Sequence, residues 1–320
     1  MIITPSPEIL LIGAGQMAVE YARVLQALKK KFLTIGRSEK SVIEFEKATS
    51  RPAIPGGIHN WLNKNRVVPE TAIVATDETM LGPITRLLIN HGVRQILVEK
   101  PGGLNLADLS QTRLTAKKHQ AGVFIAYNRR FFASTIKAGE LIKKDGGVKS
   151  FNFDFTERSH LIEKLNKPPV VKKEWLLANS SHVIDLAFFL GGKPKKINTY
   201  TAGDGGLAWH PQASIFTGSG LSQNRALFSY HADWQSAGRW AIEIVTPKQK
   251  LIFRPLEKLQ KQKFGKMEIE EIKLNDELDH KFKPGLYRLT QSFLTTKNNL
   301  PTIDEQIENL KYYKKIEKGC

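Results

Sequence analysis

The sequence predicts an α/β protein of two domains, the first of which is built on a doubly wound parallel sheet. A chain of 320 residues is longer than one small hydrophobic core requires, so two domains are expected. Short apolar runs alternate with helix-like segments as far as residue 128, and strand-like segments with few helical patterns follow. We therefore place the domains at 1–128 and 129–320.

The first domain is expected to open with a strand, a glycine turn and a helix. Residues 8–15 ("EILLIGAG") are apolar and end in glycines, and residues 16–31 then place apolar side chains at helical spacing. This continuous apolarity is typical of parallel strands that are covered on both faces. Further apolar runs that predict buried strands lie at 32–36, 71–76, 95–99 and 122–127.

The turn carries the motif "GAGQMA" (13–18), which has the form G-x-G-x-x-A. Gly13 allows a tight turn, Gly15 lets a pyrophosphate approach the backbone, and Ala18 lets the helix pack closely on the strand. The helix that begins at Gln16 and Met17 would offer free N–H groups and a favourable dipole to that pyrophosphate. We predict a dinucleotide site here, and a glycine turn without a ligand is the alternative.

The end of the next strand favours NADP over NAD. An NAD site usually ends this strand with an acidic residue that binds the ribose 2′-hydroxyl. Here the strand ends in "TIGRSEK", so Arg37 and Ser38 stand in that place, and they suit a 2′-phosphate. Alternatively, Arg37 is merely exposed and Ser38 caps the following helix. We predict NADP as the cofactor, with NAD as the alternative.

The stretch "VEKPGG" (98–103) ends the apolar run at 95–99. A bound dinucleotide presents its reactive ring at the carboxyl edge of such a sheet, so Lys100 is expected to point into the ligand crevice. Pro101 restrains Lys100 to extended backbone geometry. A solvent-facing lysine that merely ends a strand is the alternative.

Five motifs occur in the order "GAGQMA", "IVATDET", "VEKPGG", "AYNRRF" and "SSHVIDLAFFLGG", and they extend over almost the whole chain. In this order the sequence resembles the glucose–fructose oxidoreductase and inositol dehydrogenase (Gfo/Idh/MocA) family. The resemblance implies a Rossmann domain and a C-terminal α/β domain with a large, open, mainly antiparallel sheet that mediates oligomerisation. Strand-like segments that fit this sheet are 148–158, 195–203, 226–234 and 239–247.

The resemblance also implies where cofactor and substrate bind. Lys100 is expected beside the nicotinamide and the reacting sugar carbon, and the "YNRR" element is expected between cofactor and substrate. Arg129 and Arg130 could bind a substrate phosphate or carboxylate, although Arg130 could equally form an interdomain salt bridge. The cofactor contacts that the resemblance implies are Ala75, Thr76, Glu99, Lys100 and Asn128.

His182 matches a family histidine that commonly acts as general acid/base, so Lys100 and His182 are the expected catalytic residues. Imidazole can accept and donate a proton close to neutral pH. A helix is predicted at 179–192, with polar caps before it and glycines after it, and it places His182 and Asp185 on one face. Without the resemblance, a helix-cap histidine bonded to Asp185 is the simpler interpretation.

Two departures from the family pattern bear on catalysis. Many members carry Asp or Asn four residues before this histidine, where the chain has Ala178, and Met80 replaces another frequent histidine. Either a neighbouring polar residue orients His182, or Lys100 handles the proton alone, or catalysis has been lost. The candidates for that orienting role are Asn179, Ser180 and Asp185. The expected substrate contacts are Lys100, Arg129, Asn179, His182 and Asp185.

These residues indicate an NADP-linked oxidoreductase that transfers a hydride between nicotinamide and a sugar or nucleotide-sugar carbon, with surface-polysaccharide synthesis as its setting. A non-catalytic dinucleotide-binding sensor or scaffold is the second hypothesis, because Ala178 and Met80 depart from the pattern. A nucleic-acid-binding protein is the third, and net charge alone favours it.

Composition bounds the remaining classes. Cys320 is the only cysteine, so internal disulfides are impossible and no metal site is expected. The chain has neither a leader-like N-terminus nor a long apolar run, which predicts a cytoplasmic protein without a membrane contact. Lys+Arg exceeds Asp+Glu by 48 − 31 = 17. The lysines are scattered and no nucleic-acid module accompanies them, so they indicate a solvated surface or small anionic ligands.

The open sheet implied for the second domain also predicts the assembly. We expect such a sheet to leave a large apolar face unburied in a monomer, and symmetric pairing would cover it. A homodimer or homotetramer is therefore expected.

Overall fold

A computed structural model describes residues 7–319 of the chain, which forms two compact units. The first unit holds the described residues up to Tyr127 together with Lys281–Ile307. The second holds Asn128–His280 and the described residues from Glu308 onward. The chain therefore changes unit at residue 128 and twice more near its C-terminal end.

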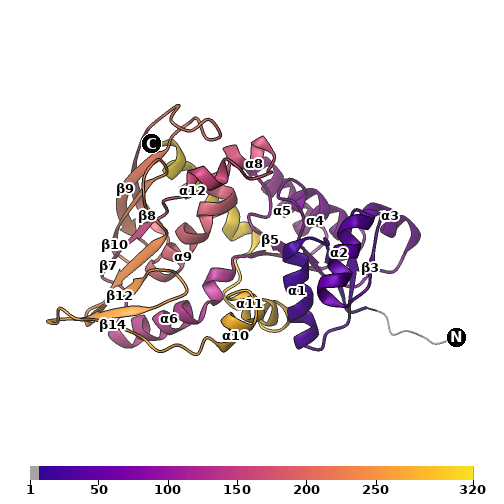
Figure 1. The fold of residues 1–320 in the computed structure, drawn as a ribbon, viewed down its shortest axis with the longest axis horizontal. Coiled ribbons are helices and arrows are strands. Elements are labelled where there is room, and N and C mark those ends of the chain that lie inside the picture. The colour runs from indigo at the N-terminus through magenta and orange to yellow at the C-terminus, as the bar shows by residue number, and fades with distance from the viewer. Residues whose placement is uncertain (1–6, 320) are drawn as a thin grey trace. The chain divides into compact units, whose positions relative to one another are not determined.

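The first unit contains a six-stranded sheet in the order β3-β2-β1-β4-β5-β6 (Figure 1, indigo to violet). Every neighbouring pair is parallel, which confirms the doubly wound prediction. The strands are β1 (Ile9–Ile12), β2 (Phe32–Ile35), β3 (Ala53–Ile54), β4 (Thr71–Val74), β5 (Gln95–Glu99) and β6 (Gly122–Ala126). Each of the predicted apolar runs holds a strand, whereas β3 is too short to produce a pattern.

Helices follow the strands of this sheet, and two of the five begin at a residue whose side chain caps them. Ser38 precedes α2 and its side chain accepts a hydrogen bond from the Ser41 N–H, and Asn105 caps α5 in the same way through Asp108. The helices are α1 (Gln16–Ala27), α2 (Glu39–Thr49), α3 (Gly57–Lys64), α4 (Leu81–Asn90) and α5 (Leu106–Lys118).

A C-terminal segment returns to the first unit. It contains α11 (Leu286–Leu294), which packs against α1. Leu286, Leu289 and Phe293 are fully buried, and the Phe293 ring lies 6.1 Å from that of Phe124 on β6. This burial fixes the segment on the sheet, because exposing each of these side chains would cost about 1.5–3 kcal/mol. The helices on either side are α10 (Glu277–Lys281) and α12 (Ile303–Lys318).

The second unit is built on an eight-stranded sheet in the order β14-β13-β12-β11-β7-β10-β9-β8. All neighbours are antiparallel except β7 and β10, so the sheet is mainly antiparallel as predicted. The strands are β7 (Ser150–Asp154), β8 (Pro194–Ala202), β9 (Ile215–Ser222), β10 (Leu227–Asp233), β11 (Ala241–Val245), β12 (Gln249–Phe253), β13 (Gln260–Lys263) and β14 (Ile269–Glu271). The helices are α6 (Ala133–Asp145), α7 (Ser159–Ile162), α8 (Pro169–Lys173) and α9 (Ser181–Gly191).

An aromatic core joins α9 to one face of this sheet. Phe188 on α9 meets Phe153 and Phe228 edge to face, with ring centres 5.4 and 5.3 Å apart. Phe153 in turn stacks on Tyr230 of the neighbouring strand at 5.4 Å. Such contacts between large side chains dominate the energy of a core, so the sheet face toward α9 is the buried one.

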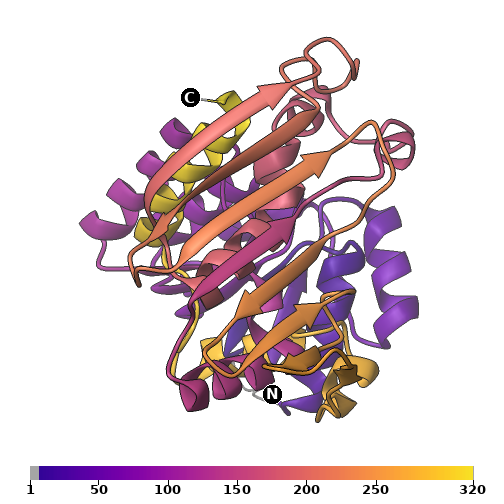
Figure 2. The ribbon, with the colours of Figure 1, turned by 90° about the vertical axis from the view of Figure 1, so that its left-hand side faces the viewer.

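The opposite face of the sheet looks toward the viewer in Figure 2, and helices of the same unit lie behind it. Strand register places Asn152, Ser229, Ser219 and Asn198 in one row across four strands, and all four side chains are exposed. The expectation that this face is apolar is wrong. The strands alternate, and most of their aromatic residues turn to the α9 side, whereas Tyr200 and Leu227 are large apolar side chains exposed in the strands of the open face.

The predicted helix at 179–192 is present as α9, but its N-terminal cap is not. Ser180 makes no capping hydrogen bond through its side chain, because the chain enters α9 through a π-helical turn at Leu176–Ser180. At the other end Gly192 has φ +97°, which suits the glycine that the sequence provides. No helix among residues 7–319 is long and apolar enough to cross a membrane.

Candidate functional site

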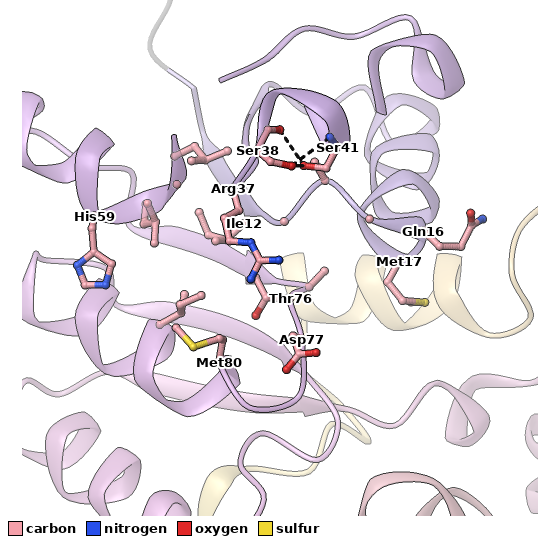
Figure 3. Close-up of a pocket in the computed structure, with 18 residues that line it drawn as sticks. Ile12, Gln16, Met17, Arg37, Ser38, Ser41, His59, Thr76, Asp77 and Met80 are labelled. Atoms are coloured by element: carbon pink, nitrogen blue, oxygen red, sulfur yellow. Dashed lines mark hydrogen bonds between the residues drawn. The ribbon is translucent and has the colours of Figure 1, made fainter. Parts of the chain in front are cut away.

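A cavity of about 580 Å³ opens in the first unit at the carboxyl ends of β1, β2 and β4 (Figure 3). The strand order changes direction between β1 and β4, which is where doubly wound sheets bind dinucleotides. The predicted cofactor contacts that line the cavity are Gly13, Gly15, Gln16, Met17, Arg37, Ser38, Ala75 and Thr76.

The glycine turn fits a dinucleotide phosphate. Gly13 has φ +117°, and a Cβ added there would lie 2.2 Å from the carbonyl oxygen of Ala75, so only glycine fits. A Cβ added to Gly15 would meet no atom within 4 Å beyond its chain neighbours, so this space is open to a ligand. The first turn of α1 has neither a side-chain cap nor an acidic residue, which leaves its N–H groups for an anion.

The end of β2 presents a cation to the cavity. Arg37 extends into it toward Thr76 (Figure 3), and neither its guanidinium nor the buried Thr76 Oγ1 has a hydrogen-bond partner among the described residues. Ser38 Oγ donates to Ser41 Oγ at 3.0 Å and accepts from the Ser41 N–H at 3.3 Å. Ser38 thus caps α2, which was the alternative considered for it, while Arg37 is available to an anionic ligand.

Strand β5 ends at Glu99, whose side chain is hydrogen-bonded to Tyr21. Tyr21 donates a hydrogen bond to Glu99 Oε1 at 2.7 Å. Burial raises the pKa of Glu99, while the Tyr21 hydrogen bond and the ammonium groups of Lys100 and Lys283 oppose that rise. Burial also raises the pKa of Tyr21 well above its ordinary value, and the charge of Glu99 adds to the effect. Tyr21 therefore stays a proton donor that fixes Glu99 beside Lys100.

Lys100 follows the carboxyl end of β5, as the sequence predicted, and is partly exposed. The peptide bond between Lys100 and the buried Pro101 is cis. Glu99 and Lys100 are not among the residues that line the cavity, and Asn128 belongs to the second unit. Their contacts with a cofactor therefore stay predictions.

In the second unit, two of the predicted substrate residues lie beside Trp240. The guanidinium carbon of Arg129 is 4.8 Å from the centre of the Trp240 ring, and the His182 ring centre is 6.3 Å from the same ring. Arg129 Nη1 also donates to Asn128 Oδ1 at 3.5 Å. His182 keeps only 7% of its surface exposed, so its ring is largely buried beside Trp240.

Arg130 forms a buried ion pair with Asp185. Its Nε and Nη2 donate to the two carboxylate oxygens at 2.8 and 2.6 Å, and the side chains are 5% and 2% exposed. The guanidinium also lies over the Phe189 ring at 4.8 Å. Both partners belong to the second unit, so this is an internal pair that supports α9.

Asn179 and Ser180 share one acceptor. Asn179 Nδ2 and Ser180 Oγ both donate to Glu157 Oε1, at 3.0 and 2.7 Å, and Glu157 is buried. These contacts hold the π-helical turn before His182 to the segment that follows β7. No group of three or more His, Cys, Asp or Glu side chains in residues 7–319 is arranged to hold a metal ion.

Comparison with known families decides the nature of the first unit. A family model described as an oxidoreductase family with an NAD-binding Rossmann fold (Gfo/Idh/MocA) matches residues 8–127. The first unit therefore carries a Gfo/Idh/MocA oxidoreductase domain. The match covers the parallel sheet, the glycine turn and Lys100, and it confirms the resemblance inferred from the motifs. No curated protein matches the chain.

Solved structures extend the likeness to the second unit. An oxidoreductase from Agrobacterium radiobacter in complex with NAD+, L-tartaric acid and magnesium has a TM-score of 0.78 at 14% identity, over 98% of this chain and 96% of its own. The WlbA dehydrogenase from Chromobacterium violaceum in complex with NADH and UDP-GlcNAcA has a TM-score of 0.70 at 15% identity, over 98% of this chain and 94% of its own. UDP-N-acetylglucosamine 3-dehydrogenase GnnA from Acidithiobacillus ferrooxidans has a TM-score of 0.69 at 14% identity, over 96% of this chain and 95% of its own. At these identities the likeness shows the shared two-domain α/β fold.

The structure adds residues that sequence patterns did not single out. His59 on α3 and Ser41 on α2 line the cavity, and Figure 3 shows His59 across it from Met17. The glycine pair at the start of α3 was a usable signal for a turn near His59, since Gly56 and Gly57 both have positive φ. Glu157 and Trp240 carry no such signal, because only tertiary packing brings them to residues 179–182.

Proposed function

We propose that the protein is an NADP-preferring oxidoreductase that transfers a hydride between nicotinamide and a sugar or nucleotide-sugar carbon, as a cytoplasmic homodimer or homotetramer. The observation that carries the cofactor choice is Arg37, whose guanidinium enters the cavity of an NAD-binding domain without an anionic partner among the described residues. A ribose 2′-phosphate would supply that partner through charge-assisted hydrogen bonds.

When bound, the cofactor supplies or accepts the hydride at its nicotinamide ring. Lys100 would hold its ammonium group at the reacting oxygen, where it stabilises the negative charge that develops as the substrate hydroxyl loses its proton. His182 would accept that proton in oxidation and return it in reduction. Arg129 and Asn179 would orient the sugar. Asp185 would contact the substrate beside them while it remains paired with Arg130.

A nucleotide-activated sugar is the proposed substrate class. Two of the structurally similar proteins are a dehydrogenase crystallised with UDP-GlcNAcA and a UDP-N-acetylglucosamine dehydrogenase, and both share this fold. A net charge of +17 favours an anionic ligand, and Arg129 provides a guanidinium for a diphosphate. Surface-polysaccharide synthesis is a setting in which such substrates are consumed.

A non-catalytic sensor of the same fold is the competing proposal, and two residues favour it. Ala178 is 98% buried and carries no polar group that could orient His182, and Met80 lines the cavity where a histidine is frequent in the family. The sensor would bind the dinucleotide without consuming it.

Turnover assays separate the two proposals. The purified chain is incubated with NADP+ and, one at a time, with nucleotide sugars and free sugars, and reduced nicotinamide is followed by its absorbance. We expect reduction with at least one nucleotide sugar, and a rate that is lower by roughly 10²- to 10⁴-fold when Lys100 is replaced by Met. Tight NADPH binding without turnover on any member of the panel would favour the sensor.

A further inference from the structure

Lys283 lies in the C-terminal segment that returns to the first unit, between α10 and α11. Its side chain is exposed, but its backbone is well anchored, because Leu286 and Leu289 begin the buried face of α11 three and six residues later. The α11 helix packs against α1, the helix that follows the glycine turn. The fold thus brings a lysine from late in the chain to the start of α1.

The ammonium group of Lys283 meets a poor acceptor there. Its Nζ lies 3.0 Å from Met17 Sδ, and this thioether is its one hydrogen-bond acceptor among residues 7–319. The charge of Lys283 acts on Glu99, yet no ion pair between the two is formed. A full positive charge is therefore held near a weak acceptor, which leaves its hydrogen-bonding capacity for a stronger one.

Met17 links Lys283 to the cavity. Met17 lines it in the first turn of α1, and Figure 3 shows its side chain on the other side of the cavity from His59. The turn contains no carboxylate that would compete for a cation, and the open space in front of Gly15 lies two residues away. An anionic oxygen bound at the glycine turn would be a stronger hydrogen-bond acceptor for Lys283 than the Met17 thioether.

We infer that Lys283 is a phosphate-binding residue of the cofactor site, which donates to the diphosphate of the dinucleotide across Met17. The inference rests on the proposed dinucleotide function and deepens it. Arg37 and Lys283 then serve different groups, since Arg37 meets the 2′-phosphate at the end of β2 and Lys283 meets the diphosphate at α1. The cofactor site of the first unit would thus need residues from both ends of the chain.

Calorimetric binding of cofactor fragments tests this division. ADP-ribose contains the diphosphate without nicotinamide or 2′-phosphate, and 2′-AMP contains the 2′-phosphate without a diphosphate. We expect Lys283→Gln to weaken the binding of ADP-ribose, NADH and NADPH by about 5- to 20-fold, which is the effect of losing one partly solvated charged hydrogen bond. Binding of 2′-AMP should be unchanged, and Lys283→Arg should restore ADP-ribose affinity.

Lys281→Gln is the matched control, because it removes the same charge from the same segment, and it should bind every ligand as the native chain does. Equal ADP-ribose affinity in the native chain and Lys283→Gln would overturn this inference alone. So would a loss confined to a nucleotide sugar added to the NADPH complex, because Lys283 would then serve the substrate. A native chain that binds neither ADP-ribose nor either dinucleotide would overturn the proposed function as well.

Discussion

Arg37 and Lys100 are the two cations on which the proposed chemistry depends, and they act at different places in the first unit. Arg37 lies in the cavity at the end of β2, whereas Lys100 follows β5 beside Glu99. Loss of Arg37 should therefore change which dinucleotide binds, while loss of Lys100 should change what the bound dinucleotide does. This separation makes the two roles independently testable.

Replacement of Lys100 by Met should leave NADPH affinity nearly intact, because the glycine turn and Arg37 are expected to make most of the cofactor contacts. Turnover should fall by roughly 10²- to 10⁴-fold, the range for a lost proton donor or electrostatic stabiliser. His182→Asn should cost less if Lys100 is the main acid/base, and as much if the two act as one unit. Steady-state turnover and NADPH titration of both variants decide this. Unchanged turnover of Lys100→Met would show that "VEKPGG" only ends a strand and takes no part in catalysis.

Among the elements, the turn between β1 and α1 combines a structural glycine with a functional one. Gly13 is required by its positive φ and by the nearby Ala75 carbonyl, whereas Gly15 faces open space. The two positions are two residues apart and have different physical reasons to be glycine. A methyl group at each should therefore produce different defects.

Gly13→Ala should destabilise the chain by more than 1 kcal/mol, about the cost of a strained positive φ, because the added methyl also collides with the Ala75 carbonyl. Gly15→Ala should unfold like the native chain but bind NADPH at least tenfold more weakly, since its methyl occupies the space for the diphosphate. Thermal unfolding and NADPH titration of both variants test this. Full NADPH affinity in Gly15→Ala would show that no phosphate approaches the turn.

The C-terminal part of α12 is held by a partly buried charged network in the second unit. Lys314 Nζ contacts Glu174 Oε2 at 2.6 Å and Glu317 Oε2 at 2.7 Å, and His210 Nε2 lies 3.9 Å from Glu317 Oε1. Burial alone would raise the pKa of Glu317, but the hydrogen bond and charge of Lys314, together with the nearby His210 ring, outweigh it and lower that pKa. The ionised form of Glu317 is thus favoured by folding.

Glu317→Gln should lower the free energy of unfolding by about 1–3 kcal/mol at pH 7, the cost of a broken buried charged hydrogen bond. Because folding lowers the pKa of Glu317, its ionised form contributes stability at pH values above the unfolded pKa, which is near 4.3 for Glu. That stability is lost as the pH falls through the folded pKa. The difference between native chain and variant should therefore shrink below about pH 4. Urea titration followed by tryptophan fluorescence measures it, because four of the five tryptophans lie at 175–240. The exposed Lys311→Gln is the control, and a difference that does not depend on pH would contradict the assignment.

The sequence predicted the elements whose local pattern is strong and missed those without one. The apolar runs of β1, β2, β4, β5 and β6 were sufficient, as were the aromatic alternations of β7 and β10. By contrast, β9 contains Gly218 and Gly220, and β13 is the polar run "QKQK", so neither has the composition of a strand. The sites followed the same rule. The glycine turn and Lys100 were found from local motifs, but Trp240, Glu157 and Lys283 act through contacts between distant residues.

At the scale of the whole molecule, the chain divides into two units that each contain a discontinuous piece of sequence. A sequence pattern cannot show that residues 281–307 return to the first unit, because their contacts with α1 and β6 are non-local. The polar open face of the second sheet likewise follows from register, which the sequence alone did not fix. An interface on that face would depend on hydrogen bonds and ordered water more than on apolar burial.

We expect a homodimer or homotetramer in solution, because the family resemblance assigns oligomerisation to this open sheet. Light scattering at micromolar protein concentration measures the mass. Replacement of Ser229 by Lys, in the exposed polar row, should shift the assembly toward smaller species without changing NADPH affinity. A native mass near 36 kDa, that of one chain, would contradict the prediction.

The most direct test of the central claim is calorimetric titration of the native chain with NADPH and with NADH. If Arg37 meets a 2′-phosphate, NADPH should bind at least tenfold more tightly, a difference of about 1.4 kcal/mol, and Arg37→Asp should erase or reverse that preference. Lys40→Asp, an equal charge reversal on α2, should leave the preference in place. Equal affinity of the native chain for NADPH and NADH would contradict the claim that Arg37 selects NADP.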